Sequence, residues 1–182
     1  MSESKYAEDL ALAHLLADIA DAISLDRYQS LDLVITTKPD NTPVTDADRA
    51  VETAIREALA THRPNDGLLG EEFGSDITGA KRYWVIDPID GTRSYIAGHK
   101  DFGNLISLTQ NKKPIIGIIN CPAHNERWVG ATNQSSTVNK QTINTSSVTA
   151  IEDAYIFTSG LYFDEPHLRN AVDKIKNKVM IN

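Results

Sequence analysis

Three apolar, β-branched runs lie in the middle of the chain, and they restrict the fold more than any other feature. They are Tyr83–Ile86, Leu105–Thr109 and Ile115–Asn120. Short runs of this composition, bounded by turn formers, are typical of buried strands. Residues 111–114, with the sequence Asn-Lys-Lys-Pro, predict a turn between the second and third runs. We therefore expect three buried strands, the last two of them paired as a central hairpin.

Two helices are predicted before these strands. The first covers residues 6–25. Its expected buried stripe consists of Leu10, Leu15, Ile19, Ala22 and Ile23. The second begins at a capping box, because Thr45 lies three residues before Asp48 and an apolar repeat follows as far as Pro64. Residues 31–37, between the helices, alternate in polarity and predict a further strand.

The last part of the chain predicts the beginning of a second structural unit. Residues 133–149 are rich in Ser, Thr and Asn and predict an irregular connection or a domain junction. A strand, a helix and a second strand are expected beyond it, at residues 154–158, 165–176 and 178–182. Because such a unit cannot bury itself alone, we predict an α+β half over residues 1–145 and a truncated α/β half over residues 146–182.

Composition disfavours several classes of partner. The chain has 18 Lys and Arg residues against 25 Asp and Glu residues, a formal charge of −7, which disfavours attraction to nucleic acid or to an anionic membrane. No apolar run approaches the ~20 residues that span a bilayer, and the amino terminus lacks a signal pattern. We therefore expect a cytoplasmic protein. A phosphate-binding site in so acidic a chain needs local positive charge, for which a metal ion is the obvious source.

Acidic residues gather where regular structure is expected to break. They are Asp46, Glu71, Glu72, Asp87 and Asp90. A turn at Asp87-Pro-Ile-Asp90 would project both carboxylates and the Ile89 carbonyl from one rigid edge. Hard oxygen ligands on a constrained turn suit Mg²⁺, and like charges held together are costly unless a cation neutralises them. These residues therefore predict a magnesium site.

Each acidic segment also has a purely structural interpretation. Asp90-Gly91 is a common hairpin turn, and Asp46 could be a plain helix cap. A calcium loop counted from Asp87 fails, because its twelfth position is Gly98. After Asp90, residues 91–98 predict a short helix whose first N–H groups would favour an anion.

The motifs resemble those of the inositol monophosphatase family of metal-dependent phosphatases. The residues that carry the resemblance are Gly70-Glu71-Glu72 and the run from Trp84 to Thr92. Segments at residues 10–14, 21–27, 38–49 and 69–74 are similar to the histidinol-phosphatase branch. The resemblance implies a layered αβαβα fold, Mg²⁺ as cofactor and a homodimer when full length. The family's carboxy-terminal Trp-Asp motif, which supplies a further metal-binding Asp, has no match, so we expect the carboxy-terminal part to be missing.

The resemblance also implies a role for each residue of the motifs. Glu72 would lie behind the metal ligands or next to a further metal. The remaining roles are metal binding by Glu71, Asp87, the Ile89 carbonyl and Asp90; activation of the attacking water by Asp46 and Thr92; and substrate binding by Glu71, Asp90, Gly91 and Thr92.

The predicted reaction is in-line hydrolysis of a small phosphate monoester, without a covalent enzyme intermediate. The resemblance favours histidinol phosphate, an intermediate of histidine biosynthesis. Inositol 1-phosphate or another sugar phosphate is the alternative within the same class. A truncated, non-catalytic remnant is the alternative from another class.

Overall fold

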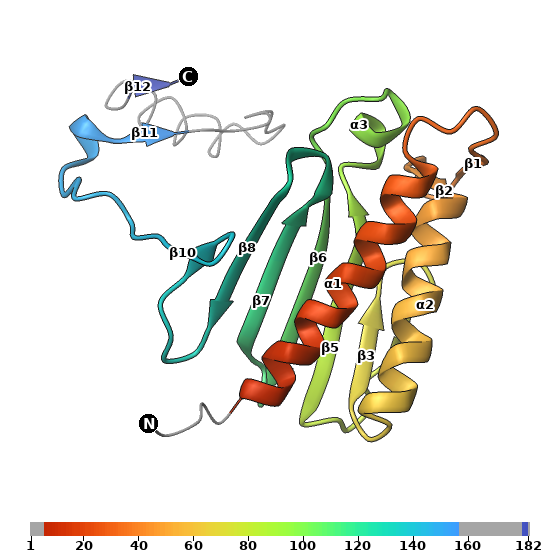
Figure 1. The fold of residues 1–182 in the computed structure, drawn as a ribbon, viewed down its shortest axis with the longest axis horizontal. Helices are drawn as coiled ribbons and strands as arrows, with labels where there is room; N and C mark the ends of the chain where they lie inside the picture. Colours follow the sequence, from red (N-terminus) through yellow and green to blue (C-terminus); the bar gives the residue numbers. More distant parts are fainter. Residues whose placement is uncertain (1–5, 157–179, 182) are drawn as a thin grey trace. The chain divides into compact units, whose positions relative to one another are not determined.

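The computed structural model describes residues 6–156 and 180–181 (Figure 1). The chain divides into two compact units, residues 1–143 and 144–182, and each is described by itself. The helices of the first unit are α1 (Ala7–Arg27), α2 (Asp46–His62), α3 (Thr92–Ile96) and the 3₁₀ helix η1 (Pro122–His124). Its strands are β1 (Ile35–Thr37), β2 (Pro43–Thr45), β3 (Gly67–Gly70), β4 (Ser75–Asp76), β5 (Arg82–Asp90), β6 (Gly103–Gln110), β7 (Lys113–Cys121), β8 (Glu126–Ala131), β9 (Thr137–Val138) and β10 (Gln141–Thr142).

An eight-stranded sheet organises the first unit. Its strand order is β10-β9-β8-β7-β6-β5-β3-β4, and all neighbours are antiparallel except β3 and β5, which run parallel. The three predicted strands are confirmed as β5, β6 and β7, and β6 and β7 form the predicted hairpin. Figure 1 shows α1 and α2 lying side by side across one face of the sheet. The β1–β2 hairpin is separate from this sheet and leads directly into α2.

The core lies between the two helices and the sheet. Every second residue of a strand points to the same face of the sheet. The buried face carries Trp84, Ile86, Ile106, Leu108, Ile116 and Ile118. From α2 come Val51, Ile55 and Leu59. Trp84 is completely buried, and its indole Nε1 donates to Asp66 Oδ2 at 3.0 Å, so its polar atom is satisfied.

The buried stripe of α1 differs from the prediction. Its members are Leu12, Ala13, Leu16, Ala17 and Ala20, whereas Leu15 is 40% exposed. Because α1 carries apolar residues on more than one side, their spacing alone did not identify the buried face. The alanines on that face allow α1 to pack closely against α2 and the sheet.

The start of α2 is confirmed, but the strand predicted before it is shorter than expected. Thr45 Oγ1 accepts from the Asp48 N–H at 3.3 Å, and Asp48 Oδ2 accepts from the Thr45 N–H at 2.8 Å, which completes the capping box. Of residues 31–37 only Ile35–Thr37 form a strand. Just before it, Arg27 Nη2 donates to the Asp32 carbonyl at 3.1 Å and holds that segment in a turn.

The second unit is described only at its ends. It contains the 3₁₀ helix η2 (Ile151–Asp153) and two short parallel strands, β11 (Tyr155–Ile156) and β12 (Met180–Ile181). The helix predicted at residues 165–176 lies outside the described residues. The identification of the two units with α+β and α/β halves stays a prediction. No helix in the described part of the chain is both long and apolar enough to cross a membrane.

Candidate active site

The parallel pairing of β3 and β5 brings two predicted metal ligands together. Gly70 pairs with Ile86, so the next residue on each strand, Glu71 or Asp87, follows at the same end of the sheet. The two carboxyl groups lie close enough for each to shift the pKa of the other. Asp90 lies three residues further on, beyond a β-bulge that bends the end of β5. The sequence-distant residues Glu71 and Asp87 therefore converge, as predicted.

Asp87 lies in an environment that opposes its negative charge. Its Oδ1 atom is buried and has no hydrogen-bond partner among the described residues. Burial first, and then the hydrogen bond and charge of Glu71, raise the pKa of Asp87 to about 8. The charges of Asp90 and Asp48 act in the same direction. A carboxylate in this position needs a cation to be ionised at neutral pH.

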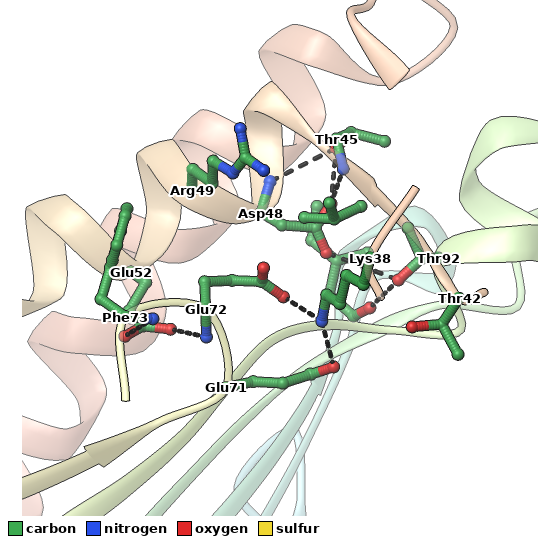
Figure 2. A network of polar contacts seen from close by, with 12 residues as sticks. Lys38, Thr42, Thr45, Asp48, Arg49, Glu52, Glu71, Glu72, Phe73 and Thr92 are labelled. Carbon is green, nitrogen blue, oxygen red and sulfur yellow. Dashed lines mark hydrogen bonds and ion pairs between the residues drawn. The ribbon is translucent and has the colours of Figure 1, made fainter. Parts of the chain in front are cut away.

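Lys38 supplies the positive charge nearest to the two consecutive glutamates. Its Nζ lies 2.7 Å from Glu71 Oε1 and 2.6 Å from Glu72 Oε1, and Figure 2 shows the ammonium between the two carboxylates. The turn between β1 and β2 carries Lys38 to this place, with the Lys38 N–H donating to the Thr42 carbonyl at 2.8 Å. No motif in the sequence predicts a role for Lys38.

Asp48, rather than Asp46, is the partner of Thr92. The Thr92 hydroxyl lies 3.4 Å from Asp48 Oδ1 and donates to the Ile89 carbonyl at 3.0 Å (Figure 2). Asp48 is 2% exposed, and burial raises its pKa although the hydrogen bonds from Thr45 act against that shift. This carboxylate is therefore desolvated and fixed in direction at the start of α2.

The predicted pairing of Asp46 with Thr92 is wrong. Asp46 Oδ2 instead accepts from Arg27 Nη2 at 2.7 Å, and its Oδ1 accepts from the Val34 N–H at 3.3 Å. Helix residues two positions apart do not face the same way, so Asp46 and Asp48 point to different partners. The capping box contained the missing signal, because it turns the Asp48 side chain back toward Thr45.

The turn after β5 is shaped by a glycine and anchored to α1. Gly91 has φ +84°, and a Cβ there would lie 2.8 Å from the Asp101 carbonyl oxygen, so only glycine fits. The short helix α3 follows and is confirmed. Its Tyr95 donates to the Ser24 carbonyl of α1 at 2.7 Å and packs edge-on against Phe102, with 4.8 Å between ring centroids. These contacts hold Thr92 beside Asp48.

The carboxylate and carbonyl oxygens at this site are suitable ligands for a divalent cation, but they are not arranged as a complete coordination shell. In residues 6–156 and 180–181, no three Asp, Glu, His or Cys side chains converge as a metal ion would require. Glu71 is turned to Lys38. The features that fit a cation are the unpartnered Oδ1 and raised pKa of Asp87 beside a second carboxylate. A cation there would replace a proton on Asp87.

A sequence model described as the inositol monophosphatase family matches residues 5–181. The chain belongs to this family. The match covers nearly its whole length, and it confirms the family resemblance of the motifs around Glu71 and Asp87.

Several curated relatives of this inositol monophosphatase family member are named histidinol-phosphatases. The chain is 44% identical to one from Streptomyces coelicolor over 86% of its own length and 62% of that relative. It is 49% identical to one from Mycobacterium tuberculosis over 68% of its length and 48% of that relative. The chain thus spans about half to three-fifths of these curated relatives.

A solved inositol monophosphatase from Zymomonas mobilis has the same fold. It is 40% identical and superimposes with a TM-score of 0.82, which covers 98% of this chain and 70% of the other. The predicted fold class, an α+β inositol-monophosphatase-like fold of which the chain spans a part, is confirmed.

Proposed function

We propose that this chain holds the cation- and phosphate-binding part of a phosphate monoester hydrolase whose substrate is histidinol phosphate. The convergence of Glu71 with the desolvated Asp87, next to the Asp48–Thr92 pair, carries the proposal. Two relatives named histidinol-phosphatase, at 44% and 49% identity, support the choice of substrate. A homodimer and a cytoplasmic location remain predictions.

Glu71, Asp87, the Ile89 carbonyl and Asp90 would hold Mg²⁺, as the family resemblance implies. When bound, this ion polarises phosphate oxygens and lowers the pKa of a bound water. Side chains and backbone groups of the chain itself would bind the phosphate and orient the attacking water. Glu71 and Asp90 would bind the substrate as well as the ion.

The Asp48–Thr92 pair is suited to orient the attacking water. When Thr92 directs its proton toward the Asp48 carboxylate, the lone pairs of the hydroxyl are free to accept a hydrogen bond from water. The backbone N–H groups of Gly91 and Thr92 would hold the phosphate, as the family resemblance implies, and Gly91 has the left-handed backbone that this turn requires. The Thr92 hydroxyl and these N–H groups lie on the same turn, so the attacking water and the phosphate would be held next to each other.

Two alternatives remain, and one of them has an observation in its favour. The solved relative from Zymomonas mobilis is called an inositol monophosphatase, which favours inositol 1-phosphate or another sugar phosphate as substrate. The non-catalytic remnant stays an alternative prediction, and the chain spans 62% and 48% of the two histidinol-phosphatases.

Phosphate release with Mg²⁺ separates the three proposals. The 182-residue chain and a version extended through a Trp-Asp motif are each assayed with histidinol phosphate and with inositol 1-phosphate. We expect the kcat/KM for histidinol phosphate to exceed the other by at least about tenfold. Preference for inositol 1-phosphate contradicts the proposed substrate. Turnover by the extended version alone supports the remnant interpretation for the shorter chain.

A further inference from the structure

The end of β3 and the loop after it, residues 70–74, are built around one buried carboxylate, that of Glu52 on α2. The Glu52 side chain has no exposed surface. Its Oε2 accepts from the Glu72 N–H at 2.7 Å, and its Oε1 accepts from the Phe73 N–H at 3.2 Å (Figure 2). The charge is balanced by Arg56, whose Nε and Nη2 donate to Oε1 at 2.9 and 2.7 Å. The carboxylate therefore binds two backbone N–H groups and a guanidinium at the same time.

The backbone of this loop is pressed against the carboxylate and closed on itself. A Cβ at Gly70 would lie 1.9 Å from Glu52 Oε1, so a larger residue cannot occupy that position unless Glu52 moves. The Gly70 N–H donates to the Gly74 carbonyl at 3.1 Å, and Arg56 Nη2 donates to the same carbonyl at 2.6 Å. Contacts with the Glu52 carboxylate and the Arg56 guanidinium thus determine the backbone path through Glu71 and Glu72.

We propose that Glu52 is a positioning residue for the cation site. Its carboxylate holds the backbone N–H groups of Glu72 and Phe73, and this fixes the directions in which the Glu71 and Glu72 side chains leave the loop. In Figure 2 those two side chains extend from the loop toward Lys38, while the Glu72 nitrogen faces Glu52. The inference rests on the proposed function in one respect, namely that Glu71 is a cation ligand.

A purely structural role for Glu52 is the competing explanation. A buried carboxylate is costly unless it is paired and hydrogen-bonded, and an apolar side chain could fill the same volume. The geometry favours positioning, because both backbone N–H groups bound by Glu52 belong to the loop that carries the proposed ligand.

Glu52→Gln tests the proposal with little change of volume. Glutamine replaces one acceptor oxygen by an NH₂ group, which cannot accept from a backbone N–H. Mn²⁺ is the probe, and free Mn²⁺ is measured by electron paramagnetic resonance during titration of the 182-residue chain. We expect Mn²⁺ affinity to fall roughly 10–100-fold, the usual effect of losing a group that orients a metal ligand. Amide hydrogen exchange of Glu72 and Phe73 should accelerate in the metal-free variant.

Asp9→Asn is the matched control, because Asp9 is also a nearly buried carboxylate held by arginines. It accepts from Arg63 Nη2 at 3.0 Å and from Arg82 Nη1 at 3.0 Å, beyond the carboxyl end of α2 and away from the site. We expect this variant to lower thermal stability while Mn²⁺ affinity and the exchange of Glu72 and Phe73 stay within about twofold of the wild-type values. Equal loss of affinity in both variants overturns the positioning role.

The two possible failures can be told apart. A wild-type chain that binds no Mn²⁺ overturns the proposed cation site, and the positioning proposal with it. Normal wild-type binding, with unchanged affinity and exchange in Glu52→Gln, overturns the positioning role alone. If Glu52→Gln does not fold, Gly70→Ala displaces the same carboxylate without removing its charge and should cause the same loss of Mn²⁺ affinity.

Discussion

Asp87→Asn should remove divalent-cation binding and raise the stability of the metal-free chain. An amide keeps the shape but loses the negative charge, so the loss of Mg²⁺ affinity should exceed the roughly 10–100-fold typical of residues that only support a ligand. The stability should rise, because the wild-type chain must bury Asp87 beside Glu71 and near the charge of Asp90. Calorimetric titration with Mg²⁺ and thermal unfolding without metal measure the two effects.

The control for Asp87→Asn is Glu57→Gln, which makes the same change of charge at an exposed position on α2. We expect it to leave both Mg²⁺ affinity and metal-free stability close to the wild-type values. An Asp87→Asn variant that binds Mg²⁺ as tightly as the wild type, or that is less stable without metal, contradicts the proposed role of Asp87.

Asp48→Asn should lower kcat far more than Asp46→Asn does. Asp48 contacts Thr92, and loss of a group that positions or activates a water costs roughly 10²–10⁴-fold in rate. Asp46 faces Arg27 instead, and loss of this partly exposed pair should cost at most about 1 kcal/mol of stability and little activity. Steady-state phosphate release with Mg²⁺ measures kcat, in the extended version if the shorter chain does not turn over.

The two Asp variants are controls for each other, since both remove one negative charge from the first turn of α2. Equal rates for Asp48→Asn and wild type, together with a large loss in Asp46→Asn, would restore the assignment that the sequence favoured. Both variants should fold, because the side-chain carbonyl of Asn can still accept one of the hydrogen bonds that each Asp accepts, from Arg27 or Val34 at position 46 and from Thr45 at position 48.

Local patterns predicted the parts of the fold that depend on neighbouring residues. The hairpin of β6 and β7, the capping box at Thr45 and the short helix α3 follow from turn chemistry and strand composition. The turn predicted at Asp87–Asp90 is wrong, because these residues form the bulged end of β5. The buried face of α1 did not follow, because that helix has apolar residues on several sides and the choice of face depends on what packs against it. Leu15 is therefore exposed although its spacing suited the predicted stripe.

The site was predictable where its residues lie in one motif and less so where other elements contribute. The position of Glu71 and Asp87 at breaks in regular structure indicates their convergence, and the parallel register of β3 and β5 accounts for it. The contributions of Lys38 and Glu52 could not be inferred, since one reaches the site from a hairpin turn and the other from beneath the loop. The sequence pattern predicts Asp48 only as part of the capping box, although its side chain also faces Thr92.

Diffraction from crystals grown with Mn²⁺ tests the central claim most directly, since anomalous scattering locates this ion without reference to any assumed ligand. The account predicts an anomalous peak in contact with Glu71, Asp87, the Ile89 carbonyl and Asp90, with the Lys38 ammonium no longer bound to Glu71. Crystals that contain bound Mn²⁺ elsewhere, while Glu71 keeps its contact with Lys38 and Asp87 keeps its unpartnered oxygen, would contradict it.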